Sequence, residues 1–181
     1  MLQDELIKAA LEAGADNATV IDISNVVLSD AFLTNCKGNQ CGNYGKNWSC
    51  PPYPDGNIDQ LMEEVKSFRF CLLYQTICPM EDSYDYEGMA AAGKELCDLS
   101  QKLNEKLPAL LTASYLHLGG LCQLCHHCTR SSGEPCRYPE YAIRTMSGYG
   151  IDVYNTTADT DLKYTNGQNT VTNFGMVFFS E

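Results

Sequence analysis

The sequence has few basic residues and no long apolar run. Lys and Arg number 12 against 23 Asp and Glu, giving a formal charge of −11, and no segment gathers basic side chains into a phosphate-binding patch. No stretch approaches the roughly 18 consecutive apolar residues of a membrane-spanning helix, and the first residues lack the basic start and apolar run of a signal peptide. We therefore expect a cytoplasmic protein that binds neither nucleic acid nor a membrane.

A glycine-rich phosphate loop is also missing, since no such loop follows an apolar run that could form a strand. This absence disfavours a reaction driven by ATP or by a nicotinamide dinucleotide. Cysteine, in contrast, is abundant: there are 10 in a chain without a secretion signal. Because the cytoplasm keeps thiols reduced, metal ligation or thiol chemistry is favoured over disulfides. Exposed metal clusters held by thiolates are usually oxygen-sensitive, which favours an anaerobic host.

The apolar pattern predicts one domain, residues 1–181, with an α/β or α+β sandwich fold, because predicted helices alternate with predicted strands. Apolar periodicity and capping residues predict helices over 3–13, 58–67, 85–107 (closed by Pro108) and 139–147. Apolar, Val- and Ile-rich runs predict strands over 18–28, 68–77 and 110–118. The tail, 164–179, is predicted to form a closing hairpin or an edge strand. Two segments without apolar period, 35–56 and 121–137, are predicted to be loops inserted into this body; we call them the first and second cysteine loops.

The second cysteine loop carries the strongest metal-binding pattern. Cys122, Cys125 and Cys128 follow one another at intervals of three, and Cys136 comes eight residues later. Three closely spaced cysteines in a loop can surround a cubane, with the fourth arriving from farther along the chain, as in bacterial ferredoxins. Zinc usually prefers two separated pairs of ligands, so it is the alternative here. We predict a [4Fe-4S] cluster, with the adjacent His126 and His127 as exposed or supporting residues and as substitute ligands only for zinc.

The first cysteine loop supplies Cys36, Cys41 and Cys50, and Pro51 follows the last of them. Its glycines permit close backbone approach to a thiolate or sulfide, and the proline stiffens the chain beside a ligand. These features suit a second cluster with one iron open to substrate. The alternative is a structural loop of reduced cysteines, with Trp48 and Tyr53 filling the core. Lys46 is a candidate proton donor or anion contact, against the simpler interpretation of a solvated side chain.

The remaining cysteines, Cys71, Cys78 and Cys97, fall in or beside apolar runs and are predicted to be core thiols. The alternative is that one of them completes the site formed by the first cysteine loop.

The motifs together resemble a known family. They are Asn35-Cys36, Gln40-Cys41-Gly42-Asn43-Tyr44-Gly45-Lys46-Asn47-Trp48-Ser49-Cys50-Pro51-Pro52, the Cys122, Cys125, Cys128 and Cys136 set with Arg137-Tyr138-Pro139, Gly148-Tyr149-Gly150-Ile151-Asp152-Val153 and Asn169-Thr170-Val171-Thr172-Asn173-Phe174. This set resembles the uncharacterised family of predicted metal-binding proteins called domain of unknown function 2284. The resemblance implies metal at the second cysteine loop and makes the first cysteine loop part of the same design. It implies no substrate.

Three functions follow from these patterns. The first is an iron–sulfur protein with one or two [4Fe-4S] clusters that passes electrons to a partner enzyme, whose basic surface would suit the acidic chain. The second is a redox enzyme that binds a small molecule at an open iron beside Cys36, Cys41 and Cys50. The third is a zinc-stabilised binding module. The sequence pattern does not decide whether the protein is an enzyme.

Overall fold

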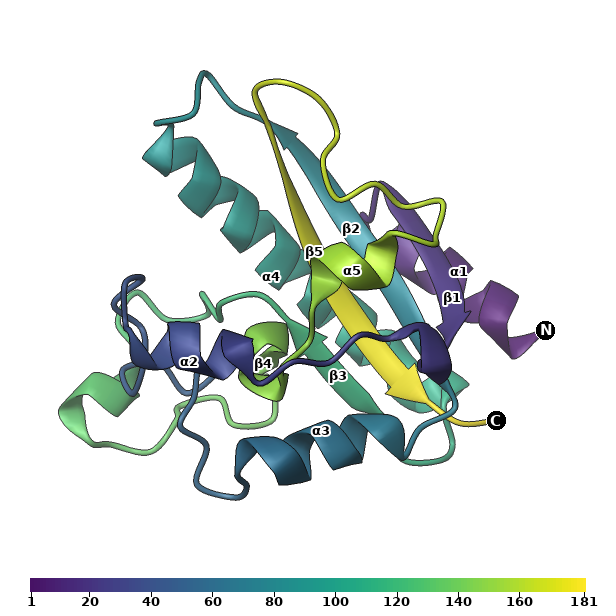
Figure 1. The fold of residues 1–181 in the computed structure, drawn as a ribbon, viewed down its shortest axis with the longest axis horizontal. Helices are drawn as coiled ribbons and strands as arrows, with labels where there is room; N and C mark the ends of the chain where they lie inside the picture. Colours follow the sequence, from purple (N-terminus) through teal and green to yellow (C-terminus); the bar gives the residue numbers. More distant parts are fainter.

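The computed structural model, which describes all 181 residues, places helices on both faces of a five-stranded sheet (Figure 1). The α-helices are α1 (Leu2–Ala13), α2 (Ala31–Lys37), α3 (Ile58–Lys66), α4 (Tyr86–Leu110) and α5 (Val153–Thr157). The strands are β1 (Asn17–Asp22), β2 (Phe70–Pro79), β3 (Leu116–Gly119), β4 (Arg144–Thr145) and β5 (Thr170–Phe179). Three single-turn 3-10 helices complete the list: η1 (Ile23–Asn25), η2 (Thr129–Ser132) and η3 (Met146–Tyr149).

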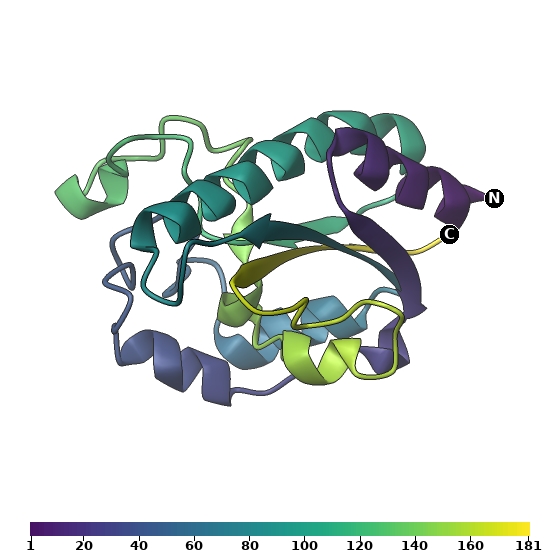
Figure 2. The ribbon, with the colours of Figure 1, turned by 90° about the horizontal axis from the view of Figure 1, so that it is seen from above.

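The sheet is mixed, with the strand order β1-β2-β5-β3-β4. Four of its five strands pair antiparallel with their neighbours, and only β4 lies parallel to β3. In Figure 2, α1 and α4 cover one face, while α2, α3 and α5 lie on the other. This arrangement confirms the predicted fold class in its α+β form. None of the helices combines the length and the apolar character needed to cross a membrane.

Alternation along the two long strands builds one core on each face. On β2, Leu72 and Tyr74 face α1 and α4, whereas Cys71 and Leu73 face the other side. Successive strand residues point to opposite faces, so a strand buried on both sides is apolar throughout. Position 175 on β5 requires glycine, because the fully buried Tyr74 ring occupies the space that a side chain would need.

The predicted starts of two helices are confirmed by side-chain caps. The Asn57 side chain accepts a hydrogen bond from the backbone N–H of Gln60 at 3.1 Å, and the Gln60 side chain bonds back to the Asn57 N–H at 3.0 Å. This capping box satisfies two backbone donors at the start of α3. At α4, the Asp85 carboxylate accepts from the Gly88 N–H at 2.8 Å. Asp55, the other candidate cap for α3, pairs instead with Arg144 at 2.7 Å.

Two predicted elements end early or do not form. The strand predicted over 18–28 stops at Asp22, whose carboxylate accepts from the Ser24 N–H at 2.9 Å and starts the turn η1. The helix predicted over 139–147 is wrong: the segment turns and enters β4 and η3. A long-range bond from the Thr145 N–H to the Ser49 carbonyl, 2.9 Å, holds this backbone against the first cysteine loop.

The C-terminal half differs from the prediction in two further places. Pro108 does not close α4, because Leu107 and Leu111 are buried in the core and the helix continues to Leu110. The strand predicted over 110–118 is therefore shorter than expected and is confined to β3. The tail forms no hairpin or edge strand: β5 lies between β2 and β3, since Phe174 to Phe179 are buried on both faces.

A buried histidine links β3 to α4 and β2. His117 Nε2 lies 2.8 Å from the Tyr74 hydroxyl, and its Nδ1 lies 3.3 Å from the Asn104 side-chain oxygen. Tyr74 also hydrogen-bonds Ser100 at 2.8 Å. Burial lowers the pKa of His117 to about 3, so the folded protein keeps this imidazole neutral.

We expect His117 to make stability depend on pH. The unfolded chain takes up a proton at this residue once the pH falls below about 6.5, whereas the folded chain does not until about pH 3. The free energy of unfolding should therefore fall by up to about 1.4 kcal/mol per pH unit as the pH is lowered from 6.5. His117→Gln should flatten this slope in urea titrations at pH 7.0 to 4.5, whereas replacing the exposed His126 should not. A wild-type slope that persists in His117→Gln would contradict the assignment.

Candidate metal centre

The three cysteines of the first cysteine loop line one cavity of about 480 Å³. Cys36 lies in the last turn of α2, so the loop begins three residues later than predicted, after Lys37. Cys41 is exposed, whereas Cys50 is buried. A cavity that gathers three thiols from one loop is the geometric requirement for a shared ligand site.

Two of these thiols contact hydroxyl groups. Cys36 Sγ lies 3.8 Å from the Ser147 hydroxyl on η3, and Cys50 Sγ lies 3.9 Å from the Ser49 hydroxyl. Burial, with smaller contributions from the neighbouring Cys41 and Cys36, raises the pKa of the Cys50 thiol to about 11. A buried thiol of this kind stays protonated at neutral pH without a cation, and metal binding would displace its proton.

The four cysteines of the second cysteine loop line a separate and much smaller cavity. Cys122, Cys125, Cys128 and Cys136 are all partly buried around it, together with Trp48 from the first cysteine loop. The chain reaches this arrangement by turning at η2 between Cys128 and Cys136. The structure thus brings each predicted set of cysteines together, the three in one cavity and the four in another.

The two cysteine loops are bonded to each other. The Trp48 backbone N–H donates to Cys128 Sγ at 3.4 Å, and the Trp48 indole donates to the Glu134 carbonyl at 3.2 Å. The Asn47 side chain donates to the Cys122 carbonyl at 3.1 Å, and the Cys122 N–H donates to the Ser49 hydroxyl at 3.1 Å. Figure 1 shows the two loops side by side at one end of the sheet. The two cavities therefore belong to one interlocked unit.

Arg130 is a residue that the sequence analysis missed. Its guanidinium donates to the backbone carbonyls of Asn47 at 3.0 Å, Cys50 at 2.6 Å and Pro52. It also lies over the Trp48 ring, 4.9 Å from the ring centroid. No side-chain pattern in the sequence identifies this role, because the partners are backbone carbonyls, several of which a planar donor fork can reach at once.

Cys97 was predicted to be a core thiol, with completion of the first site as the alternative. It lies on α4 against Cys122 of the second cysteine loop, so it is placed away from the first site. A hydrogen bond from Cys122 and one from the Gln123 N–H, 3.4 Å, lower the pKa of Cys97, and the same contact raises the pKa of Cys122. The Cys97 thiol therefore lies beside a predicted ligand of the second site. Cys71 and Cys78 are buried, as predicted for core thiols.

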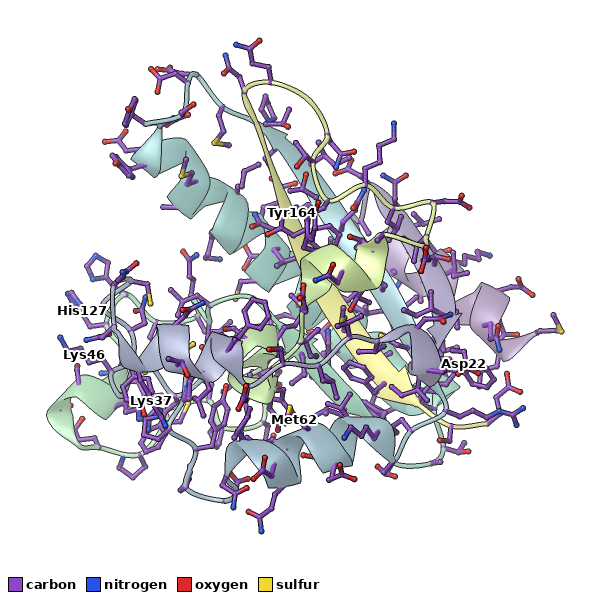
Figure 3. All side chains as sticks on the ribbon, in the orientation of Figure 1. Asp22, Lys37, Lys46, Met62, His127 and Tyr164 are labelled. Atoms are coloured by element: carbon purple, nitrogen blue, oxygen red, sulfur yellow. The ribbon has the colours of Figure 1, made fainter.

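The other candidate residues lie at the surface. His126 and His127 are exposed, with their rings 4.3 Å apart and nearly perpendicular. Lys46 is exposed and borders the same wide cleft as both histidines. Figure 3 shows Lys46 and His127 at the same end of the molecule, away from Tyr164 and α5. None of the three lines the cavity that holds Cys36, Cys41 and Cys50.

The two sets of cysteines do not form a site for a single metal ion. No three Cys, His, Asp or Glu side chains converge on one point as the ligands of one ion would. A zinc ion draws its thiolates to within about 2.3 Å of one centre. A cubane binds each thiolate at a different iron, so its ligands stay farther apart around a shared space. Neither set of cysteines meets the single-ion requirement.

Comparison with known proteins gives one match. Neither the curated proteins nor the solved structures include a chain that matches this one. The model of one protein family, described as predicted metal-binding protein (DUF2284), matches residues 19–179, a span that contains both cysteine loops. Because this match covers most of the chain, the protein belongs to that family of predicted metal-binding proteins.

Proposed function

We propose that the protein is an iron–sulfur redox protein with two adjacent [4Fe-4S] clusters. Cys122, Cys125, Cys128 and Cys136 would hold a fully ligated cluster, and Cys36, Cys41 and Cys50 would hold one with an open iron. A bound cubane gains and loses single electrons, which is the chemistry that the clusters supply. The observation that carries the proposal is the interlocking of two cysteine sets, each lining its own cavity.

The chain's own residues support such clusters in three ways. The Trp48 N–H donates to Cys128 Sγ, and hydrogen bonds to ligand sulfurs adjust reduction potentials. The Cys97 thiol, which lies against Cys122, would act as an S–H donor beside that ligand once Cys122 binds iron as a thiolate. Arg130 holds the Cys50 carbonyl from the second cysteine loop, which fixes the distance between the two sets.

Electron transfer to a partner protein is the function proposed for this pair of sites. The formal charge of −11 favours docking to a basic partner surface. A second function, reduction or activation of a small molecule at the open iron, is favoured by one observation. The cavity that Cys36, Cys41 and Cys50 share, about 480 Å³, is much larger than the cavity at the four-cysteine site, which leaves space for a small molecule beside a cluster.

Removing one ligand from each loop tests the two-site proposal. We expect Cys50→Ala, purified anaerobically, to contain about half the iron and sulfide of the wild-type protein, because it removes one ligand of the three-cysteine site. Cys128→Ala should also lose about half. The matched control is Cys71→Ala, which removes a fully buried core thiol and should keep the wild-type content.

The reduced EPR spectra distinguish the sites further. Two adjacent reduced clusters couple magnetically, so the wild-type signal should be broadened and each single-site variant should give a simpler spectrum. An iron content in Cys50→Ala equal to that of the wild type would show that the first cysteine loop holds no cluster. Stoichiometric zinc without sulfide would instead support the zinc-stabilised binding module.

A further inference from the structure

The side chains that line the cavity beside Cys36, Cys41 and Cys50 indicate which kind of molecule it would bind. Aromatic side chains reach it from four separate segments: Phe32 of α2, Tyr44 of the first cysteine loop, Tyr154 of α5, and Tyr164 of the segment before β5. Leu121, Met146, Ile151 and Val153 supply most of the remaining apolar wall. Its volume, about 480 Å³, lies in the range of small-molecule sites.

The cavity contains no basic residue. Lys, Arg and His are absent from its lining, so nothing there would neutralise a phosphate or a carboxylate. The only carboxylate in the lining is Asp152, and both of its oxygens accept hydrogen bonds from Asn155, at 3.0 and 2.6 Å. Because the Asp152 carboxylate is already engaged, the lining offers no free partner to a cation and no positive charge to an anion.

The polar side chains of the lining are also largely engaged. Ser147 accepts from Cys36, Thr145 contacts the Tyr53 hydroxyl at 3.2 Å, and the Asn43 amide donates to the Cys41 carbonyl at 3.1 Å. A ligand with many hydrogen-bonding groups would leave those groups unpaired in an apolar space. The site therefore suits a molecule with little polar surface.

Two of these tyrosines pack against other aromatic rings. Tyr154 and Tyr164 meet edge to face, with centroids 5.3 Å apart, and Tyr164 stacks on Phe174 at 5.8 Å with its plane tilted by only 13°. Contact with Phe174 thus fixes the Tyr164 ring, which also borders the cavity, and Figure 3 shows Tyr164 above α5. Tyr154 keeps 64% of its surface exposed although it sits at the cavity mouth, so its ring area is available for a ligand.

We propose that this cavity binds an uncharged aromatic small molecule against the three-cysteine site. The inference rests on the proposed function for the role of Cys36, Cys41 and Cys50, and it adds the class of ligand. Burial of a flat ring against tyrosine and phenylalanine provides the affinity, and the absence of basic side chains provides selection against anions.

Three probes of one size test the ligand class. Naphthalene-2-methanol is neutral, 2-naphthoate is an anion and naphthalen-2-ylmethylammonium is a cation; each is titrated by calorimetry into anaerobically purified protein at pH 7. We expect the neutral probe to bind about tenfold or more tighter than either charged probe. Tighter binding of the anion or of the cation, or equal binding of all three, would overturn the proposal.

Substitutions show whether binding occurs in this cavity. Tyr154→Ala and Tyr164→Ala should weaken the neutral probe by about threefold to tenfold, because each removes one aromatic contact. Tyr164→Phe keeps the ring and should bind as the wild type does. Tyr84→Ala, at a tyrosine that is 77% exposed and does not line the cavity, is the matched control. Wild-type affinity in both Tyr154→Ala and Tyr164→Ala would overturn the assignment.

Iron and sulfide measured in the same samples separate the two proposals. If the protein contains no iron or sulfide but binds the neutral probe, the cluster proposal is contradicted and the proposed ligand class is supported. Iron-loaded protein that fails to bind the neutral probe would contradict the ligand class and leave the clusters standing.

Discussion

Arg130→Ala should destabilise the protein by about 3 kcal/mol. Each hydrogen bond from a charged donor contributes about 1.5–3 kcal/mol, but the Arg130 side chain is partly exposed, which lowers the total for its three hydrogen bonds. The three carbonyls that Arg130 holds, those of Asn47, Cys50 and Pro52, lie in an irregular segment. Its loss also removes the cation that lies over Trp48. The free energy of unfolding from urea titrations measures the effect.

Arg137→Ala is the matched control, because Arg137 lies in the same loop but makes one hydrogen bond, to the His127 carbonyl at 3.0 Å. We expect it to cost less than about 1 kcal/mol. Arg130→Lys should recover only part of the loss, since an ammonium lacks the planar fork that reaches several carbonyls. If the free energy of unfolding of Arg130→Ala lies within about 0.5 kcal/mol of the wild-type value, Arg130 does not hold the two cysteine loops together.

Gly148→Ala should destabilise the protein by about 3 kcal/mol and disturb the first site selectively, because it overpacks a buried position. A methyl group at Gly148 would lie 2.8 Å from Cζ of the Tyr53 ring. The Tyr53 side chain has little freedom to move away from the added methyl group. Its hydroxyl donates to the Ser49 carbonyl at 2.8 Å, and the Arg144 guanidinium lies 4.4 Å from its ring centroid. Displacing Tyr53 therefore displaces Ser49 and its neighbour Cys50.

Thermal unfolding and iron content measure the two parts of this effect. We expect a lower midpoint and iron reduced toward the Cys50→Ala level, with the second site retained. Gly119→Ala is the control, because Gly119 borders the same cavity and an added methyl would meet only ordinary contacts, at 3.4 Å or more. Equal stability and equal iron content in Gly148→Ala and Gly119→Ala would show that Tyr53 does not support the first site.

The sequence predicts the fold class and most elements, because their signals are local. The Asn57 cap sets the start of α3, and the leucine period sets α4. Predictions fail where distant contacts decide. The segment predicted to be a helix over 139–147 instead contains β4, because the Thr145 N–H donates to the Ser49 carbonyl, a partner almost a hundred residues away. Nothing near Thr145 in the sequence indicates that bond.

The grouping of cysteines follows the same division. Spacing alone groups Cys122, Cys125 and Cys128, and the structure places them around one cavity with Cys136. The neighbouring thiol of Cys97 comes from α4 and has no sequence signal apart from its residue type. Arg130 was equally hidden, because its partners are backbone carbonyls, which no side-chain pattern reveals.

The class of ligand was hidden for a related reason. Phe32, Tyr44, Tyr154 and Tyr164 belong to four segments spread over more than a hundred residues, and only the fold brings them to one cavity. Exposed tyrosines are common on protein surfaces, so composition gives no sign of a shared wall. The absence of Lys, Arg and His from that wall is likewise a property of the folded chain.

The most direct test of the two-cluster account is metal and sulfide analysis of the wild-type protein purified without oxygen. The account predicts a brown protein with about eight irons and about eight acid-labile sulfides per chain, four of each for every cubane. A colourless protein that contains zinc and no sulfide would contradict it. About four irons and four sulfides would contradict the second cluster, at Cys36, Cys41 and Cys50.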